Sequence, residues 1–136
     1  NNIDNSKKNV VLAPSYAKPH FDFRHFSDNC LKKGNLKKKS IELMNTMNYI
    51  LNKYLIENLV LKNEDLLLLK NTPNLASDSI LLNTIFFEQL NLEMYIVPNM
   101  YYNHVVHRGS NYLKEQKNNK ELNDTVYARF NKLINN

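Results

Sequence analysis

Residues 77–90 carry their apolar side chains at helical spacing. Ser77 is a suitable N-cap, because its hydroxyl can accept a hydrogen bond from a backbone N–H group that the first turn leaves unpaired. Asp78 stands in that first turn, where a negative charge interacts favourably with the helix dipole. The pattern therefore predicts an amphipathic helix that begins at Ser77. Its apolar face consists of Ile80, Leu81, Thr84, Ile85, Phe87 and Leu90.

A buried strand is predicted directly after that helix. Residues 94–97 are a short apolar run, and Pro98 lacks a backbone donor, so we expect the strand to end there. The residues that follow are of the types that bind phosphates, sugars or metals. They are Tyr101, Tyr102, His104, His107, Arg108, Gly109 and Ser110.

Extended structure is also predicted near the start of the chain. Residues 10–13 suit a short strand that ends at Pro14. In the sequence FDFRHF, the first two phenylalanines alternate with Asp22 and Arg24, which indicates a half-buried strand or an extended loop. Asp22 and Arg24 can form a local ion pair there.

A long helix is predicted over residues 40–58, with Ser40 as its N-cap. Its apolar residues share one face, which we interpret as core packing. They are Leu43, Met47, Ile50, Leu51, Tyr54, Leu55 and Leu59.

Two further helices are predicted. One covers residues 63–70, with Asn63 as its cap, Glu64 and Asp65 in its first turn, and its leucines partly buried. The other begins at about Lys120 and is expected to pack back on the core. Its apolar residues are Leu122, Val126, Ala128, Phe130 and Leu133.

Together these patterns predict an α/β protein that is mainly helical with a small sheet. The chain has 136 residues, 43% of them hydrophobic, which suffices for one core. We therefore expect a flexible lead-in over residues 1–9 and a single α/β domain over residues 10–136. No apolar run approaches the roughly 18 residues of a membrane span. Because the sequence begins with Asn1 and not with Met, we expect it to be a fragment of a larger protein.

The net charge of +5 and the lysines within residues 32–39 suit a polyanionic partner. The chain is also rich in Asn, Lys and Ile and poor in Gly and Ala, as expected of an AT-rich genome, so many lysines reflect codon supply. The lysine run lacks the interleaved aromatic residues of a base-stacking surface. A nucleic-acid-binding module is therefore an alternative that the sequence does not favour. A helical protein-interaction domain is another alternative, with the apolar helix over residues 40–58 as its contact surface.

The single cysteine, Cys30, excludes an intramolecular disulfide and a multi-cysteine zinc site. We expect it to be a buried thiol. This cysteine usage slightly favours a reducing compartment, while the compartment itself stays open.

Few familiar motifs of catalysis are present. The chain contains no GxGxxG, P-loop, HExxH, EF-hand or nucleophile-elbow pattern, which removes most familiar enzyme classes. His104 and His107 have the spacing of two metal ligands on one helical turn, but the β-branched residues around them argue against a helix, and no third ligand is obvious. The two histidines are therefore only a weak indication of a metal site. The alternative is that one imidazole is hydrogen-bonded in the core and the other is solvated. Asp78 either stabilises its helix or acts as a general base beside a cleft.

Residues 76–113, ASDSILLNTIFFEQLNLEMYIVPNMYYNHVVHRGSNYL, resemble the C-terminal half of a GT-A-type nucleotide-sugar glycosyltransferase of the family-2-like kind. In that family an acidic residue opens a helix, the chain returns along a strand of the form x-V-P, and a segment of the type YxHxVHxxS follows. The usual Glu-Asp pair is Ser77-Asp78 here, and the chain contains no Asp-x-Asp. The matching positions are Asp78, Val97, Pro98, Tyr102, His104, His107 and Ser110.

The resemblance implies a glycosyltransferase-like domain that forms the acceptor (C-terminal) side of a GT-A fold. Asp78 would be the catalytic general base that deprotonates a hydroxyl acceptor. The substrate-binding residues would be Tyr102, His104, His107, Arg108 and Ser110. Of these, His104, His107 or Arg108 would approach the donor diphosphate. His104 or His107 would ligate Mn2+ or Mg2+. The implied partners are a nucleotide sugar, a hydroxyl acceptor and an N-terminal donor-binding half, without which we expect the domain to be inactive.

Overall fold

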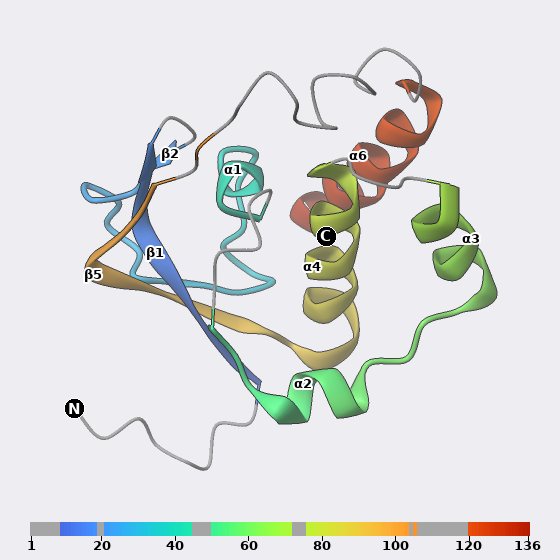
Figure 1. The fold of residues 1–136 in the computed structure, drawn as a ribbon, viewed down its shortest axis with the longest axis horizontal. Coiled ribbons are helices and arrows are strands. Elements are labelled where there is room, and N and C mark those ends of the chain that lie inside the picture. Colours follow the sequence, from blue (N-terminus) through green and yellow to red (C-terminus); the bar gives the residue numbers. More distant parts are fainter. Residues whose placement is uncertain (1–8, 19–20, 45–49, 72–75, 104, 106–119) are drawn as a thin grey trace.

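The computed structural model describes residues 9–18, 21–44, 50–71, 76–103, 105 and 120–136. Over these ranges the chain is an α/β protein with a small mixed sheet, which confirms the predicted fold class at that level (Figure 1). No helix within these ranges is both long and apolar enough to cross a membrane. The strands are β1 (Val10–Lys18), β2 (Phe21–Asp22), β3 (Cys30–Leu31), β4 (Ile50–Leu51) and β5 (Glu93–Asn103), and the helices are α1 (Ser40–Met44), α2 (Lys53–Asn58), α3 (Asn63–Asn71), α4 (Ala76–Leu90) and α6 (Lys120–Asn135).

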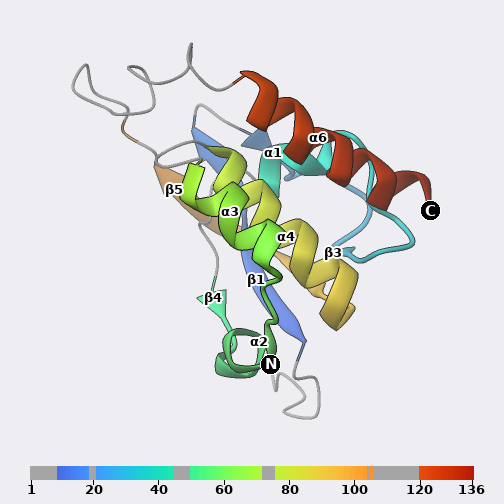
Figure 2. The same ribbon diagram turned by 90° about the vertical axis from the view of Figure 1, so that its right-hand side faces the viewer.

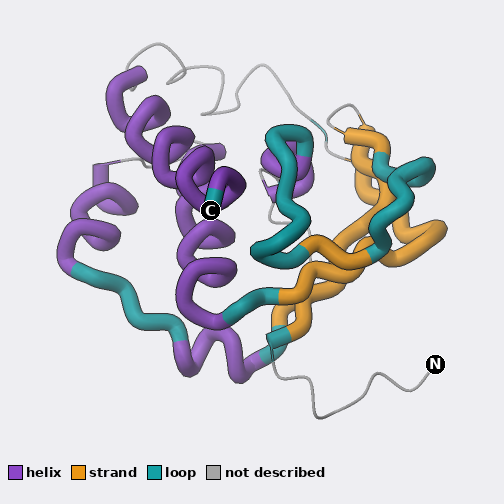
Figure 3. Tube along the Cα trace, turned by 180° about the vertical axis from the view of Figure 1, so that it is seen from behind, coloured by secondary structure: helices purple, strands orange, loops and turns teal. Residues whose placement is uncertain are grey.

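A parallel pair of the two long strands, β1 and β5, forms the centre of the sheet. Their pairing begins with Val10 opposite Glu93 and ends with Lys18 opposite Asn103. Short antiparallel strands complete the sheet: β3 pairs with the free edge of β5, while β4 and β2 pair with successive parts of the free edge of β1. Figure 3 shows the strands gathered on one side of the molecule and most of the helices on the other.

One face of the sheet packs against α4. Val11 and Ala13 of β1 and Met94 of β5 are fully buried, as are Ile80 and Ile85 of α4. Burying a valine, isoleucine or methionine side chain contributes about 1.5–3 kcal/mol to stability. Helix α6 packs across α4 and adds three buried side chains to the same core (Figures 1 and 2). They are Val126, Phe130 and Leu133.

The prediction of one long helix over residues 40–58 is wrong. Helix α1 ends at Met44, and β4 then pairs with β1 before α2 begins. Asn52 is the N-cap of α2, since its side-chain oxygen accepts a hydrogen bond from the backbone N–H of Tyr54 at 3.0 Å. Apolar residues at helical spacing also fit two short helices around a strand, and the partner of that strand lies too far away in the sequence for periodicity to reveal it. Met47 lies outside the described residues.

The predicted strand ends at Pro14 and Pro98 are also wrong, because β1 and β5 both continue past their prolines. Both prolines lie where the pairing register breaks, with residues 98–100 of β5 opposite Ser15 alone on β1. A bulge interrupts the ladder of hydrogen bonds and therefore tolerates a residue without an N–H group. Asn99 adopts a φ of 61°, in the left-handed region that asparagine enters more readily than most residues.

Several local predictions are confirmed. Phe21 and Phe23 are buried, whereas Asp22 and Arg24 are exposed and form the expected ion pair. Helix α3 carries its acids in the first turn and buries its leucines only in part, and α6 packs on the core as predicted.

Further details differ from the predictions. Helices α1 and α3 begin at Ser40 and Asn63 themselves, so neither of these residues is an N-cap. Helix α4 begins at Ala76, so Ser77 lies inside the helix and is not its N-cap. Cys30 is only half-buried, because the short strand β3 lies at an edge of the sheet. Ala128 is exposed on α6. The lead-in predicted for residues 1–9 lies outside the described residues except for Asn9.

Candidate functional site

The topology brings the start of α4 and the ends of both long strands to one edge of the molecule. Two residues separate α4 from β5, so the helix and the strand run in opposite directions. Strand β1 is parallel to β5 and therefore ends at the same edge. Figure 1 shows the first turn of α4 and the ends of β1 and β5 in the upper part of the view. Because ligands of open α/β sheets bind outside the carboxyl ends of the parallel strands, this edge is the candidate site.

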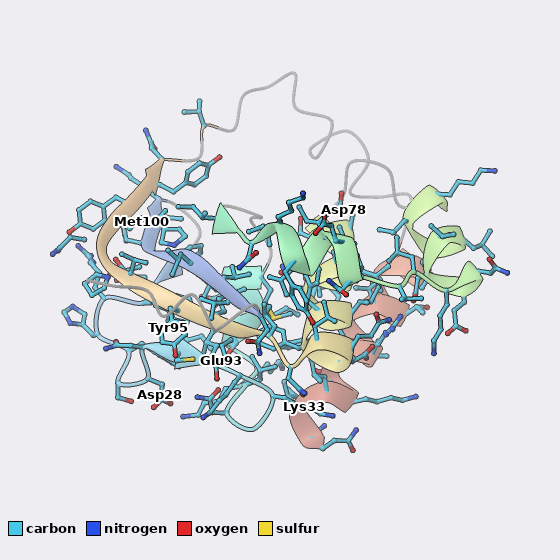
Figure 4. The ribbon with its side chains drawn as sticks, turned by 90° about the horizontal axis from the view of Figure 1, so that it is seen from below. Asp28, Lys33, Asp78, Glu93, Tyr95 and Met100 are labelled. Carbon is cyan, nitrogen blue, oxygen red and sulfur yellow. The ribbon has the colours of Figure 1, made fainter. Side chains whose placement is uncertain are left out.

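Asp78 is half-buried in the first turn of α4. Its Oδ1 accepts hydrogen bonds from the backbone N–H of Ser79 at 2.6 Å and from the Ser79 hydroxyl at 3.2 Å. Among the described residues, Oδ2 accepts no hydrogen bond, so one carboxylate oxygen can still receive a proton. Figure 4 shows Asp78 among the helices, well apart from Met100 on β5.

Tyr101 and Tyr102 project from opposite faces of the sheet. Tyr102 is paired with Ala17, whose side chain is buried on the helix-covered face of the sheet, and it therefore lies on that face as well. Tyr101 is paired with Tyr16, and the two rings contact each other edge to face with their centroids 6.0 Å apart. Tyr102 is 37% exposed. It is the one predicted substrate-binding residue that the structure describes.

The rest of the predicted site lies outside the described residues. This applies to His104, His107, Arg108 and Ser110. Over the ranges that are described, no three side chains of His, Cys, Asp or Glu form a group that can hold a metal ion. The Mn2+ or Mg2+ implied by the resemblance therefore depends on His104 or His107 and stays a prediction.

A second group of side chains lies on the outer face of the sheet, which is the face opposite α4. The guanidinium carbon of Arg24 lies 4.4 Å from the centroid of the Tyr16 ring. Arg24 donates from Nε to Oδ1 of Asp22 at 2.9 Å and from Nη2 to Oδ2 at 2.6 Å. Tyr101 adjoins them through its contact with Tyr16. We name Tyr16, Asp22, Arg24 and Tyr101 the strand-end cluster.

Hydrogen bonding dominates the electrostatics of this cluster. The side-chain and backbone hydrogen bonds from Arg24 hold the pKa of Asp22 well below its ordinary value of 3.8. The same side-chain hydrogen bond raises the pKa of Arg24. Both groups are therefore ionised at any pH near neutrality, and their charges offset each other.

The sequence indicated the ion pair of this cluster but not the cluster itself. The two-residue spacing of Asp22 and Arg24 was visible, whereas the contact between Tyr16 and Tyr101 depends on pairing between strands that are distant in the sequence. Tyr16 follows Pro14 by two positions and Tyr101 follows Pro98 by three, but this similarity is uninformative without the register.

The lysines near α1 form an exposed loop, as the sequence predicts. Lys37 and Lys39 place their ammonium groups 5.9 Å from the ring centroids of Phe26 and Phe23, respectively. Phe23 is buried and Phe26 is half-buried, so neither ring offers a free face for base stacking. Nucleic-acid binding stays a prediction, and its test is whether any binding weakens steeply as the salt concentration rises.

Comparison with known proteins gives no assignment. No protein-family model matches the chain, and no curated protein or solved structure matches it. The functional proposal therefore rests on the site geometry and on the family resemblance of residues 76–113.

Proposed function

We propose that this chain forms the acceptor side of a GT-A-like glycosyltransferase and that Asp78 is its general base. The observation that supports this most is the position of Asp78 in the first turn of α4, which begins at the same edge of the molecule as the ends of the parallel strands β1 and β5. Substrates of α/β enzymes bind at such an edge. The order of acid, helix, strand and Tyr/His/Arg/Ser segment along the chain gives independent support.

In the proposed reaction, the acceptor hydroxyl transfers its proton to Oδ2 of Asp78 as its oxygen attacks the anomeric carbon of the donor. The bond from that carbon to the diphosphate breaks, and the nucleoside diphosphate leaves with the electron pair. Oδ1 keeps its hydrogen bonds from Ser79, which orient the carboxylate. Asp78 is thereby oriented by the residue that follows it in its own helix.

The developing negative charge on the leaving diphosphate needs nearby positive charge. We assign this role to His104, His107 and Arg108, which directly follow β5. A bound Mn2+ or Mg2+ would supply further charge neutralisation. Its ligands would be His104 or His107 together with groups of the donor-binding half. Tyr102, on the helix-covered face of the sheet, would contact the acceptor sugar.

The test is transfer from UDP- and GDP-sugars, or their hydrolysis, by the full-length protein that carries this chain. Asp78→Asn keeps the size of the side chain but removes the base, so we expect kcat to fall at least about 100-fold. The matched control is Glu64→Gln, an exposed acid in the first turn of α3, which should leave kcat unchanged. An unchanged kcat in Asp78→Asn would remove Asp78 from its role. Absence of transfer and hydrolysis with every donor would overturn the proposed function.

A further inference from the structure

The strand-end cluster offers an exposed aromatic surface on the outer face of the sheet. Tyr101 is 60% exposed, and its ring adjoins Tyr16, which in turn carries the guanidinium of Arg24 over its own ring. Large exposed aromatic side chains at one place on a protein surface are typical of a binding site. The cluster has no part in the reaction proposed for Asp78, since it lies on the opposite face of the sheet.

The cluster is ordered without any ligand. Asp22 holds Arg24 through two side-chain hydrogen bonds and also accepts one from the Arg24 backbone N–H at 3.1 Å. Tyr16 and Tyr101 are fixed on paired strands, and the Tyr101 hydroxyl donates to the Asn99 side chain at 3.3 Å. These contacts restrain the side chains and so lower the entropic cost of ordering them when a ligand binds.

The charge balance of the cluster selects the chemical class of its ligand. Asp22 offsets the charge of Arg24, so the cluster has little attraction for phosphate or sulfate groups. A sugar ring presents C–H groups on its face, and these groups carry partial positive charge that interacts favourably with the negative face of an aromatic ring. The sugar hydroxyls can accept hydrogen bonds from the guanidinium and donate them to the carboxylate.

We infer that the strand-end cluster binds a neutral carbohydrate chain at a site separate from Asp78. Tyr101 supplies the stacking surface, and Asp22 and Arg24 supply the hydrogen bonds that orient the sugar. The choice of ligand class rests on the proposed function, because an extended glycan acceptor can contact both the catalytic edge and the outer face of the sheet.

The test is an NMR titration of the isotope-labelled full-length protein with neutral tetrasaccharides, without any nucleotide sugar. The probes are tetramers of β1,4-linked glucose, β1,4-linked N-acetylglucosamine and α1,2-linked mannose. We expect at least one of them to shift the amide signals of Tyr16, Arg24 and Tyr101. Tyr101→Ala should weaken this binding about tenfold, whereas Tyr101→Phe, which keeps the ring, should weaken it less than about threefold. Tyr127→Ala, at an exposed tyrosine on α6, is the matched control and should change nothing.

Two results would overturn the inference. One is the failure of all three tetrasaccharides to bind, and the other is equal affinity in the wild-type protein and in Tyr101→Ala. Preferential binding of an oligothymidine that weakens steeply with salt would show a nucleic-acid surface in its place.

The two proposals fail separately. Asp78→Asn should bind the tetrasaccharide as the wild-type protein does. Sugar transfer without tetrasaccharide binding would overturn the inference about the cluster alone. Tetrasaccharide binding without any transfer would overturn the proposed function alone.

Discussion

Arg129 on α6 forms an ion pair with Asp65 on α3, whose side chain is completely buried. The same guanidinium binds Glu88 on α4 at 2.7 Å, so it joins three helices. Asp65 also accepts a hydrogen bond from the backbone N–H of Lys62 at 3.1 Å, at the start of α3. The hydrogen bonds to Glu88 and to Asp65 raise the pKa of Arg129, which therefore stays charged at every pH at which the protein is studied.

Removing this guanidinium should destabilise the protein strongly. Arg129→Met keeps most of the side-chain volume but leaves the buried carboxylate of Asp65 without its cation, and we expect the free energy of unfolding to fall by about 3 kcal/mol. Urea-induced unfolding followed by circular dichroism measures this change. Lys132→Met, at an exposed position of the same helix, should cost less than about 0.5 kcal/mol. Equal losses in the two variants would show that the ion pair adds nothing to stability.

The carboxylate of Asp22 should titrate at unusually low pH. Its pKa in the folded state lies below the ordinary value of 3.8, so its contribution to stability is complete above about pH 4 and is lost as the pH falls through the folded-state pKa. Carbon-detected NMR of the side-chain carboxyl measures the midpoint. In Arg24→Ala the midpoint should return towards 3.8, whereas His25→Ala should raise it only slightly, because His25 is the smallest cause of the shift. If the titration midpoint of Asp22 is unchanged in Arg24→Ala, the hydrogen bonds from Arg24 do not lower the pKa of Asp22.

The amide of Asn83 should be essential for the attachment of α1. Asn83 is completely buried on α4, and its Nδ2 donates to the backbone oxygen of Met44 at 2.7 Å. Asn83→Ala leaves that carbonyl without this donor and should reduce the free energy of unfolding by about 1–3 kcal/mol. The matched control is Thr84→Val at the next buried position, where the hydroxyl donates within the helix to the backbone oxygen of Ile80 and the cost should stay below about 1 kcal/mol. Calorimetry measures the free energy of unfolding of both variants. A larger loss in Thr84→Val than in Asn83→Ala would contradict the role of the Asn83 amide.

Asn91 should resist replacement by β-branched residues. It connects α4 to β5 with a φ of 48°, and a β-branched residue is strained there. Asn91→Val should therefore cost about 1–2 kcal/mol, whereas Asn91→Gly should be almost neutral. Thermal unfolding midpoints of the two variants test this difference. If valine is tolerated as well as glycine, the connection does not need the left-handed conformation.

Periodicity in the sequence predicts the helices that form within one segment. Helices α3, α4 and α6 lie close to their predicted positions, because their apolar stripes and first-turn acids are local properties. The segment around β4 was predicted as helix because the same apolar residues fit a helical period. Its strand exists only through pairing with β1, which no property of residues 50 and 51 encodes locally.

The candidate site likewise has a part that the sequence predicts and a part that it does not. The place of Asp78 in the first turn of α4 was predictable, because the charge and the apolar stripe lie side by side in the sequence. Which of Tyr101 and Tyr102 lies on the helix-covered face was not predictable, because it depends on the register of β5 after the bulge. The two prolines misled the prediction for the same reason: a proline ends a regular ladder but fits an irregular one.

The parallel pairing of β1 with β5 also has a consequence for the order of folding. The side chain of Asn9, just before β1, bonds the backbone oxygen of Asn91, just before β5, across a sequence separation of 82 residues. At a synthesis rate of about 5–20 residues per second, β1 waits about 4–16 seconds for this partner. During that interval its apolar residues have no parallel neighbour, so the nascent chain is most exposed to aggregation before α4 and β5 leave the ribosome.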